Sequence, residues 1–177
     1  QLVAAENNVF GCGYNSDMTE QAPNAHLTAA IWHWDVYYQA AIETAMTCGG
    51  AENFVTEMGG NAYYAGLSEG FVDASTLNEL VAAPGTAAAM EAVRELIDSG
   101  EWDVFSGVKL NITVDAEAGT AAVEQVDAPL MSDGYELKDG EVVEMANPEI
   151  VPAGGASVTD DVIKSGMNYN VAGVVEG

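Results

Sequence analysis

The sequence is poor in basic residues. Its 177 residues include 4 Lys and Arg against 28 Asp and Glu, which gives a formal net charge of -24 at pH 7. Binding to nucleic acid requires clustered cations that replace the counterions of the phosphate backbone. An anionic membrane surface likewise attracts basic segments. The composition therefore excludes nucleic acid and argues against an anionic membrane surface as a partner.

Cysteine and histidine are also scarce. The two cysteines, Cys12 and Cys48, form neither a CxxC pair nor a metal-ligand pattern, and the histidines are His26 and His33. The sequence contains no GxSxG, P-loop, HExxH or GxGxxG motif. We therefore predict a protein that is not an enzyme and needs no metal or cofactor. Two separate thiols and a disulfide remain equal alternatives for the cysteines.

Long hydrophobic runs are absent, and none approaches the 18 or so apolar residues that span a bilayer. Apolar residues nevertheless make up 49% of the chain, enough for a packed core. The acidic residues are spread along the whole chain, which indicates a solvated acidic surface. Their repulsion is screened as the Debye length falls from about 10 Å in 0.1 M salt to about 3 Å in 1 M salt. We expect a halophilic protein, more stable in molar salt.

Hydrophobic periodicity predicts strands and helices that follow one another, as in the α/β class. A helix capped by Asp35 should end at Gly49 and Gly50, and a second helix should cover 87–99. Strands are expected at 8–14, 26–32, 69–74, 104–107, 110–114 and 169–175, and a hairpin across 137–144. Loops are expected at 56–66 and 147–155. A turn or short helix capped by Thr159 or Asp160 should precede the last strand.

Polar and aromatic residues follow the first two predicted strands. Ligands of open α/β sheets lie beyond the carboxyl ends of the strands, where Asn15 and Asp17 supply hydrogen-bonding groups. In an extended chain Trp32 and Trp34 share one face, and Tyr37 follows closely. Each stack of a base on an aromatic ring contributes about 1–3 kcal/mol. These residues predict a site for a flat ligand, with ordinary core packing as the alternative for each Trp.

Five segments, in order along the chain, resemble the basic membrane protein family. These are the substrate-binding lipoproteins of ABC transporters, which include purine-nucleoside receptors. The matching segments are GYNSDM (13–18), APNAHLTAAIWHWDVYY (22–38), AGLSEGFVD (65–73), IDSGEWDVFSG (97–107) and MNYNVAGVV (167–175). The similarity is weakest at 108–159, where this chain carries extra hairpin material.

The resemblance implies a type I periplasmic-binding-protein-like fold, in which Rossmann-like lobes are joined by hinge crossings. It covers only the C-terminal half of such a protein. Residues 1–34 are then part of the second lobe and end at a hinge crossing, and 35–73 return to the first lobe. Residues 74–177 supply a second-lobe helix, the hairpin insert and the closing strand.

The implied function is an extracytoplasmic solute-binding protein that captures a purine nucleoside or base in an interlobe cleft and delivers it to an ABC permease. We expect membrane anchoring through an N-terminal part that this sequence lacks. Asn15 and Asp17 match positions that hydrogen-bond a ribose or base. Trp32 stands near a position where nucleoside-binding members can have lysine, which favours a base or another flat heterocycle. Gly66 and Gly70 match glycines of the hinge strand that permit close backbone approach.

A second hypothesis belongs to a different class of function. A half-length member lacks one side of its cleft and leaves sheet edges and apolar faces that another chain could cover. Such a chain would serve as a structural, self-assembling extracellular subunit. Its partners would be a separate N-terminal half or further copies of itself.

Overall fold

The computed structural model describes residues 1–174. The chain divides into two compact units, Gln1–Ala87 and Ala88–Gly177. Helices and strands are mixed along the chain, as the α/β expectation requires. None of the helices within residues 1–174 combines the length and the hydrophobicity needed to cross a bilayer. The predicted segments 1–34, 35–73 and 74–177 concern the lobes of a longer protein and stay a prediction.

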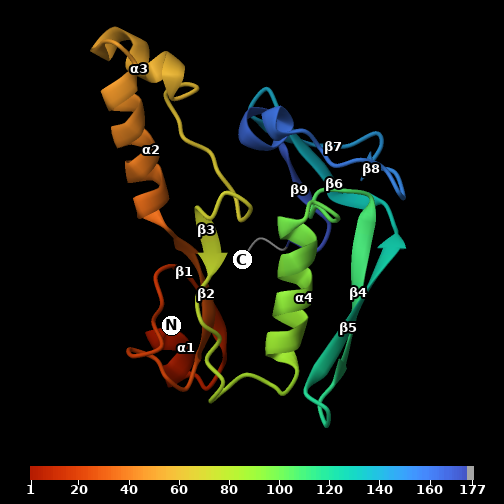
Figure 1. The fold of residues 1–177 in the computed structure, drawn as a ribbon. Coiled ribbons are helices and arrows are strands. Elements are labelled where there is room, and N and C mark those ends of the chain that lie inside the picture. Colours follow the sequence, from red (N-terminus) through yellow and green to blue (C-terminus); the bar gives the residue numbers. More distant parts are fainter. Residues whose placement is uncertain (175–177) are drawn as a thin grey trace. The chain divides into compact units, whose positions relative to one another are not determined.

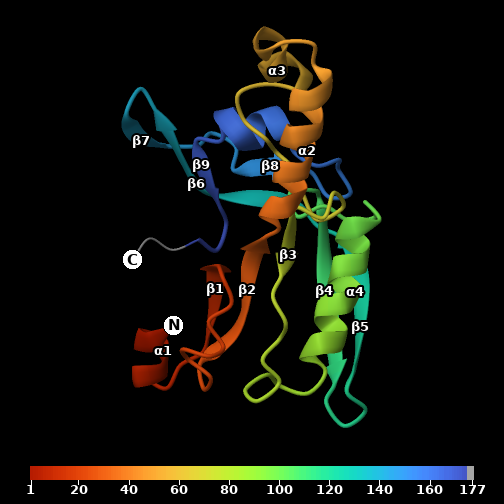
Figure 2. The same ribbon diagram turned by 60° about the vertical axis from the view of Figure 1, so that its left-hand side comes forward.

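The first unit is built around a three-stranded sheet (Figures 1 and 2). Its elements are α1 (Leu2–Glu6), β1 (Gly11–Asn15), β2 (His26–Trp32), α2 (Trp34–Thr47), α3 (Ala51–Glu57) and β3 (Val72–Ala74). In the order β1-β2-β3, β1 runs parallel to β2 and β3 runs antiparallel to it. Asn15 pairs with Ile31, so β1 and β2 end at the same edge of the sheet.

The core of the first unit is small. Ala25 and Ala29 of the β2 region are buried, His26 is fully buried, and Phe71 is 4% exposed. Gly13 brings β1 close to this core, because a Cβ there would lie 3.0 Å from His26 Cε1. Every residue of α2 is partly or fully exposed.

The second unit contains one long helix and antiparallel strands. Its elements are α4 (Thr86–Asp98), β4 (Val108–Asp115), β5 (Thr120–Asp127), β6 (Leu130–Lys138), β7 (Glu141–Glu144), β8 (Glu149–Val151), the π-helix η1 (Val162–Gly166) and β9 (Tyr169–Val171). β4 and β5 form a hairpin, while β6 pairs with β7, β8 and β9. The predicted hairpin turn is confirmed: Lys138 pairs with Glu141, and Asp139 and Gly140 both have positive φ, as a type I′ turn requires.

Several predicted elements are confirmed. The strand at 26–32 has the expected bounds, and α4 begins and ends one residue before the predicted helix. Gly49 follows α2 with φ 75°, in the left-handed conformation typical of a residue just beyond a helix.

Other predictions were wrong in detail. α2 begins at Trp34 with His33 as N-cap, so Asp35 lies in the first turn, where its charge still favours the helix dipole. Residues 104–107 form no strand, because Asp103 Oδ1 accepts the Phe105 N–H at 2.7 Å and turns the chain. Several elements were missed: β8 lies inside the predicted loop 147–155, and α3 ends just inside the predicted loop 56–66. No predicted element corresponds to α1, β5 or most of β6. The closing strand ends at Val171, and residue 175 of its predicted span lies outside the described residues.

Candidate functional site

The edge at which β1 and β2 end carries a group of aromatic side chains, called here the aromatic cluster. They come from β1, β2, α2 and the segment between α3 and β3. The members are Tyr14, Trp32, Trp34, Tyr37, Tyr38, Tyr63 and Phe71. Residues distant in sequence thus meet at the edge where ligands of parallel strands are expected.

Trp32 and Trp34 stack on each other, with ring centroids 5.8 Å apart and an interplanar angle of 28°. The rings share one side because the chain turns from β2 into α2 between them, and not because both belong to an extended strand. The His33 N–H donates to the Phe71 carbonyl at 2.8 Å and fixes this turn. The Phe71 ring packs edge-on against both indoles, at 5.3 Å from Trp32 and 5.6 Å from Trp34.

This stacking leaves no slot between the two indoles. A flat ligand inserted between them would need ring planes about 7 Å apart, twice the ordinary carbon contact distance. A ligand must therefore use the outer surface of the aromatic cluster. That surface is available, because Tyr14 is 74% exposed, Tyr38 58% and Trp34 49%.

Asn15 lies beside this aromatic surface. It is exposed and follows Tyr14, whose ring packs edge-on against Trp32 at 6.4 Å. Its φ of 77° is left-handed, a conformation that asparagine tolerates better than most residues. The structure therefore brings Asn15 to the same edge as Trp32, as the sequence predicted.

Tyr37 joins the aromatic cluster from the first turn of α2. Its ring lies 6.4 Å from that of Trp34 and 5.2 Å from that of Tyr63. Tyr63 also packs edge-on against Phe71 at 5.3 Å. Tyr37 thereby connects the helix to the segment that leads into β3. Neither Tyr63 nor Phe71 was predicted as a site residue, because nothing in the local sequence shows that their segment returns to β2.

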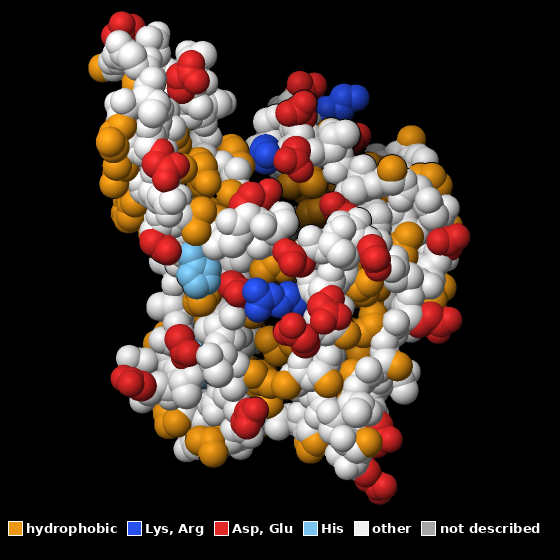
Figure 3. Space-filling model, viewed as in Figure 1, with side chains coloured by type: hydrophobic (Ala, Val, Ile, Leu, Met, Phe, Trp, Pro, Cys, Tyr) orange, Lys and Arg blue, Asp and Glu red, His pale blue; other side chains and the backbone are white. Residues whose placement is uncertain are grey.

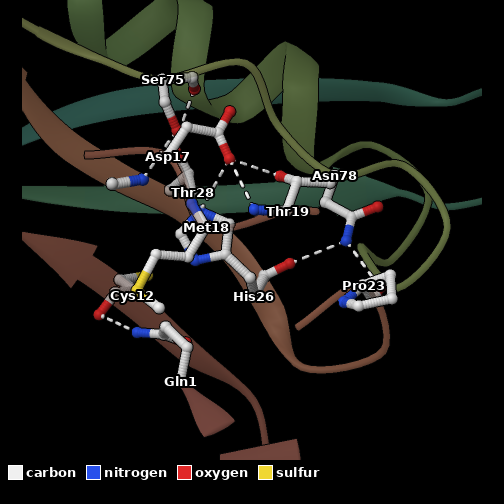
Figure 4. A network of polar contacts seen from close by, with 11 residues as sticks. Gln1, Cys12, Asp17, Met18, Thr19, Pro23, His26, Thr28, Ser75 and Asn78 are labelled. Atoms are coloured by element: carbon white, nitrogen blue, oxygen red, sulfur yellow. Dashed lines mark hydrogen bonds and ion pairs between the residues drawn. The ribbon is translucent and has the colours of Figure 1, made fainter. Parts of the chain in front are cut away.

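Asp17 lies in a different environment, a network of polar contacts (Figure 4). Its Oδ1 accepts the Thr19 N–H at 2.7 Å and the Thr19 hydroxyl at 2.6 Å, and lies 3.4 Å from His26 Nε2. The hydrogen bond from the Thr19 hydroxyl first, then that from the Thr19 N–H, lowers the pKa of Asp17. Asp17 is thus an ionised residue that orders the turn after β1, with Oδ1 already in use.

His26 also contacts the turn that follows β1. Its Nε2 accepts the Met18 N–H at 3.3 Å, and its fully buried ring has Nδ1 without a hydrogen-bond partner among the described residues. Asn78 extends the network from the segment after β3, because its Nδ2 donates to the carbonyls of Pro23 at 2.8 Å and His26 at 2.9 Å. The network therefore fixes the 16–25 connection against both β2 and the segment after β3.

The two predicted hinge glycines lie in the turn that precedes β3. The Gly66 N–H donates to Glu69 Oε2 at 2.7 Å, a bond that is the main cause of the lowered pKa of Glu69. Gly70 has φ +71°, and a Cβ built there meets no described atom within 4 Å. Glycine is thus favoured at position 70 because the chain makes a left-handed turn there, and not because another backbone segment approaches closely, as was expected.

The second unit contains a separate apolar hollow of 390 Å³ between α4 and the β4 region. The residues that line it are Val93, Trp102, Val104, Ser106, Val108, Lys109, Leu110, Ile112 and Leu130. Trp102 is held in place there, because its Nε1 donates to the Val108 carbonyl at 2.9 Å. With few polar groups to orient a heterocycle, this hollow is a weaker candidate than the aromatic cluster.

The remaining chemistry of the chain is sparse. Cys12 and Cys48 are free thiols, which decides between the alternatives left open by the sequence. Within residues 1–174, no three His, Cys, Asp or Glu side chains come together in a way that could hold a metal ion. No protein-family model matches the chain, and no curated protein sequence matches it.

Proposed function

We propose that this chain captures a small flat ligand, a purine nucleoside or base, as part of an extracytoplasmic solute-binding protein that serves ABC-type uptake. In this proposal the chain is the C-terminal portion of a type I periplasmic-binding-protein-like fold. One observation carries the proposal: exposed aromatic rings and an exposed amide lie together at the edge where the parallel strands β1 and β2 end. The order of the family-like segments along the chain supports it.

The aromatic cluster would bind the ligand by its outer surface. Phe71 and the Trp32–Trp34 stack pack together and support this surface. Few side chains therefore need to lose conformational freedom when a ligand ring binds to it. Tyr14 and Trp34 offer the exposed ring surface. The Asn15 amide, which carries both donors and an acceptor, can pair with the edge of a base. A nucleoside or free base fits this combination of stacking and paired hydrogen bonds.

Binding is tested by calorimetry and by quenching of Trp fluorescence with adenine, hypoxanthine, adenosine and guanosine in molar salt. We expect Tyr14→Ala to weaken binding by about 1–3 kcal/mol, or roughly 5- to 150-fold. Asn15→Gly keeps the left-handed backbone but removes the amide, and should weaken binding too. Tyr135→Ala, which truncates a 53% exposed Tyr of the second unit, is the matched control. Absence of binding by all four compounds would contradict the proposal.

Uptake requires two further partners, an ABC permease and the half of the protein that supplies the opposite side of the cleft. An extracytoplasmic location with a membrane anchor in that other half belongs to the same proposal. Recovery of this chain from its native source together with a polypeptide that matches the missing half would support it. Recovery from the cytoplasm would contradict it.

The second candidate, a structural self-assembling subunit, is favoured by the amount of surface left uncovered. The accessible surface is 11738 Å², whereas two separate compact units of half the 18.4 kDa mass would expose about 9,900 Å² together. Contact between the units only lowers that figure, so their relative placement does not explain the excess. Large apolar side chains contribute to this surface, among them Met46 at 80% exposure and Leu80 at 82%.

A further inference from the structure

Helix α2 carries an exposed row of large apolar side chains, called here the α2 stripe. It consists of Trp34, Tyr38, Ile42 and Met46, which follow one another at intervals of four residues. Their exposed fractions are 49%, 58%, 60% and 80%, so exposure rises toward the end of the helix. Hydrophobic side chains gather along the outer edge of α2 in the space-filling view (Figure 3). Side chains four apart lie on one face of a helix, so these residues form a continuous ridge.

The two sides of the ridge differ. On one side lies a polar row with Asp35, Gln39 and Glu43, in which Gln39 Nε2 donates to Glu43 Oε1 at 2.9 Å. On the other side lies a row that begins with Tyr37 and continues with the small side chains of Ala41 and Ala45. A ridge beside small side chains is self-complementary, because each of two copies can place its ridge against the alanines of the other.

We propose that the α2 stripe is a homodimer contact, in which it packs against the α2 stripe of a second copy of this chain. Packing of two such ridges, both made of residues four apart, is the commonest class of helix contact and crosses the helices at about -50°. A contact of one patch with itself is the isologous arrangement of two-fold dimers. The same patch on both copies also means that no other surface of the chain is required.

The available area agrees with a dimer of modest affinity. The four side chains expose on the order of 500 Å², so an isologous contact removes about 1,000 Å² from water. That value is near the lower limit of about 1,000 Å² for a specific interface, before the flanking alanines and polar row are counted. The roughly 500 Å² that the stripe exposes on one copy also matches the largest apolar patches of monomers, which are often functional.

Charge distinguishes a second copy from a basic partner. Two chains of net charge -24 repel each other, and Asp35 and Glu43 border the contact on both copies. Salt screens this repulsion and strengthens apolar burial, so dimerisation should increase between about 0.15 M and about 2 M NaCl. A basic partner helix would instead be released by salt.

The inference does not depend on the proposed ligand. Trp34 belongs to both the aromatic cluster and the α2 stripe, so the dimer is tested with Ile42 and Met46, which lie outside the cluster. Tyr14 and Asn15, the test positions for ligand binding, lie outside the stripe. Failure of one proposal therefore leaves the measurement for the other unchanged.

The test is sedimentation equilibrium of the 177-residue chain without ligand, over a wide concentration range and at both salt concentrations. We expect a monomer–dimer equilibrium whose dissociation constant rises at least about 30-fold in the double variant Ile42→Gln, Met46→Gln. Leu80→Gln, which changes an exposed Leu outside the stripe, should leave the constant unchanged. Circular dichroism checks that each variant is folded.

Three results would overturn the inference. The first is a wild-type chain that stays monomeric at every concentration in molar salt. The second is a dimer that the double variant forms as well as the wild type, or that Leu80→Gln weakens equally. The third is a dimer that dissociates as salt is added, because its contact would then be between opposite charges.

Discussion

The side-chain amide of Asn78 should be one of the largest single contributors to the stability of the first unit. Asn78 is 6% exposed, and its Nδ2 donates to the carbonyls of Pro23 at 2.8 Å and His26 at 2.9 Å. Its Oδ1 accepts the Leu80 N–H at 3.2 Å. Asn78→Ala removes all three bonds at a buried position.

The expected loss follows from these bonds. A net intramolecular hydrogen bond contributes about 1 kcal/mol, and a buried group left without its partner costs about 1–3 kcal/mol. We therefore expect Asn78→Ala to lower the free energy of unfolding by about 3 kcal/mol, a large part of the roughly 5–15 kcal/mol typical of a domain. The matched control is Asn168→Ala, because the exposed Asn168 donates from Nδ2 to the Leu137 carbonyl at 3.0 Å and to Glu136 Oε2 at 3.2 Å.

The assay is urea unfolding in molar salt, followed by circular dichroism and by Trp fluorescence. Trp32 and Trp34 report on the first unit, which contains Asn78, and Trp102 reports on the second, which contains Asn168. Fluorescence in a Trp102→Phe background therefore follows Asn78→Ala, and circular dichroism with Trp102 retained follows the control Asn168→Ala. A loss below about 0.5 kcal/mol, or one no larger than that of Asn168→Ala, would refute the assignment of Asn78 as a buried structural donor.

Three further predictions concern pH, backbone conformation and salt. The folded-state pKa of Asp17 lies below its ordinary 3.8, so its contribution to stability is complete above that value and lost as pH falls through the lower one. Asp17→Asn should therefore flatten the stability profile of acid titrations below about pH 4, and an unchanged profile would contradict this. Gly70→Ala places a Cβ at φ +71° and should destabilise by about 1 kcal/mol in urea melts, more than Gly66→Ala, which needs no left-handed backbone. The melting temperature should rise from about 0.1 M to about 1 M NaCl, whereas a steady fall would refute the screening argument.

Local patterns in the sequence determined several elements. The apolar run of β2 and its bounds, the amphipathic helix α4, and the Lys138–Glu141 turn depend on neighbours a few residues away. The turn needs positive φ at Asp139 and Gly140, and an Asp-Gly pair is typical of turns with this backbone conformation. The edge position of Asn15 and Trp32 also followed, because two parallel strands end together.

Tertiary structure decided the rest. β5 mixes Thr120, Val123 and Val126 with alanines and polar residues, so its own strand propensity is modest, and it is a strand because it pairs with β4 along its whole length. Asp17 turns back to His26 and away from the ligand edge assigned to it, and Phe71 reaches the two indoles across a long separation in sequence.

The stack of Trp32 on Trp34 also shows what the sequence predicts and what the tertiary structure decides. The sequence predicted that the two indoles would share one side of an extended strand. The strand-to-helix turn between them is instead what places them on one side, brings them into contact and leaves only their outer surface free. Residue type and spacing determine local conformation, because the forces involved act over one or two turns of chain. Which side chains meet depends on contacts between distant segments, which form only when burial of their apolar surface offsets the entropy of closing the loop between them.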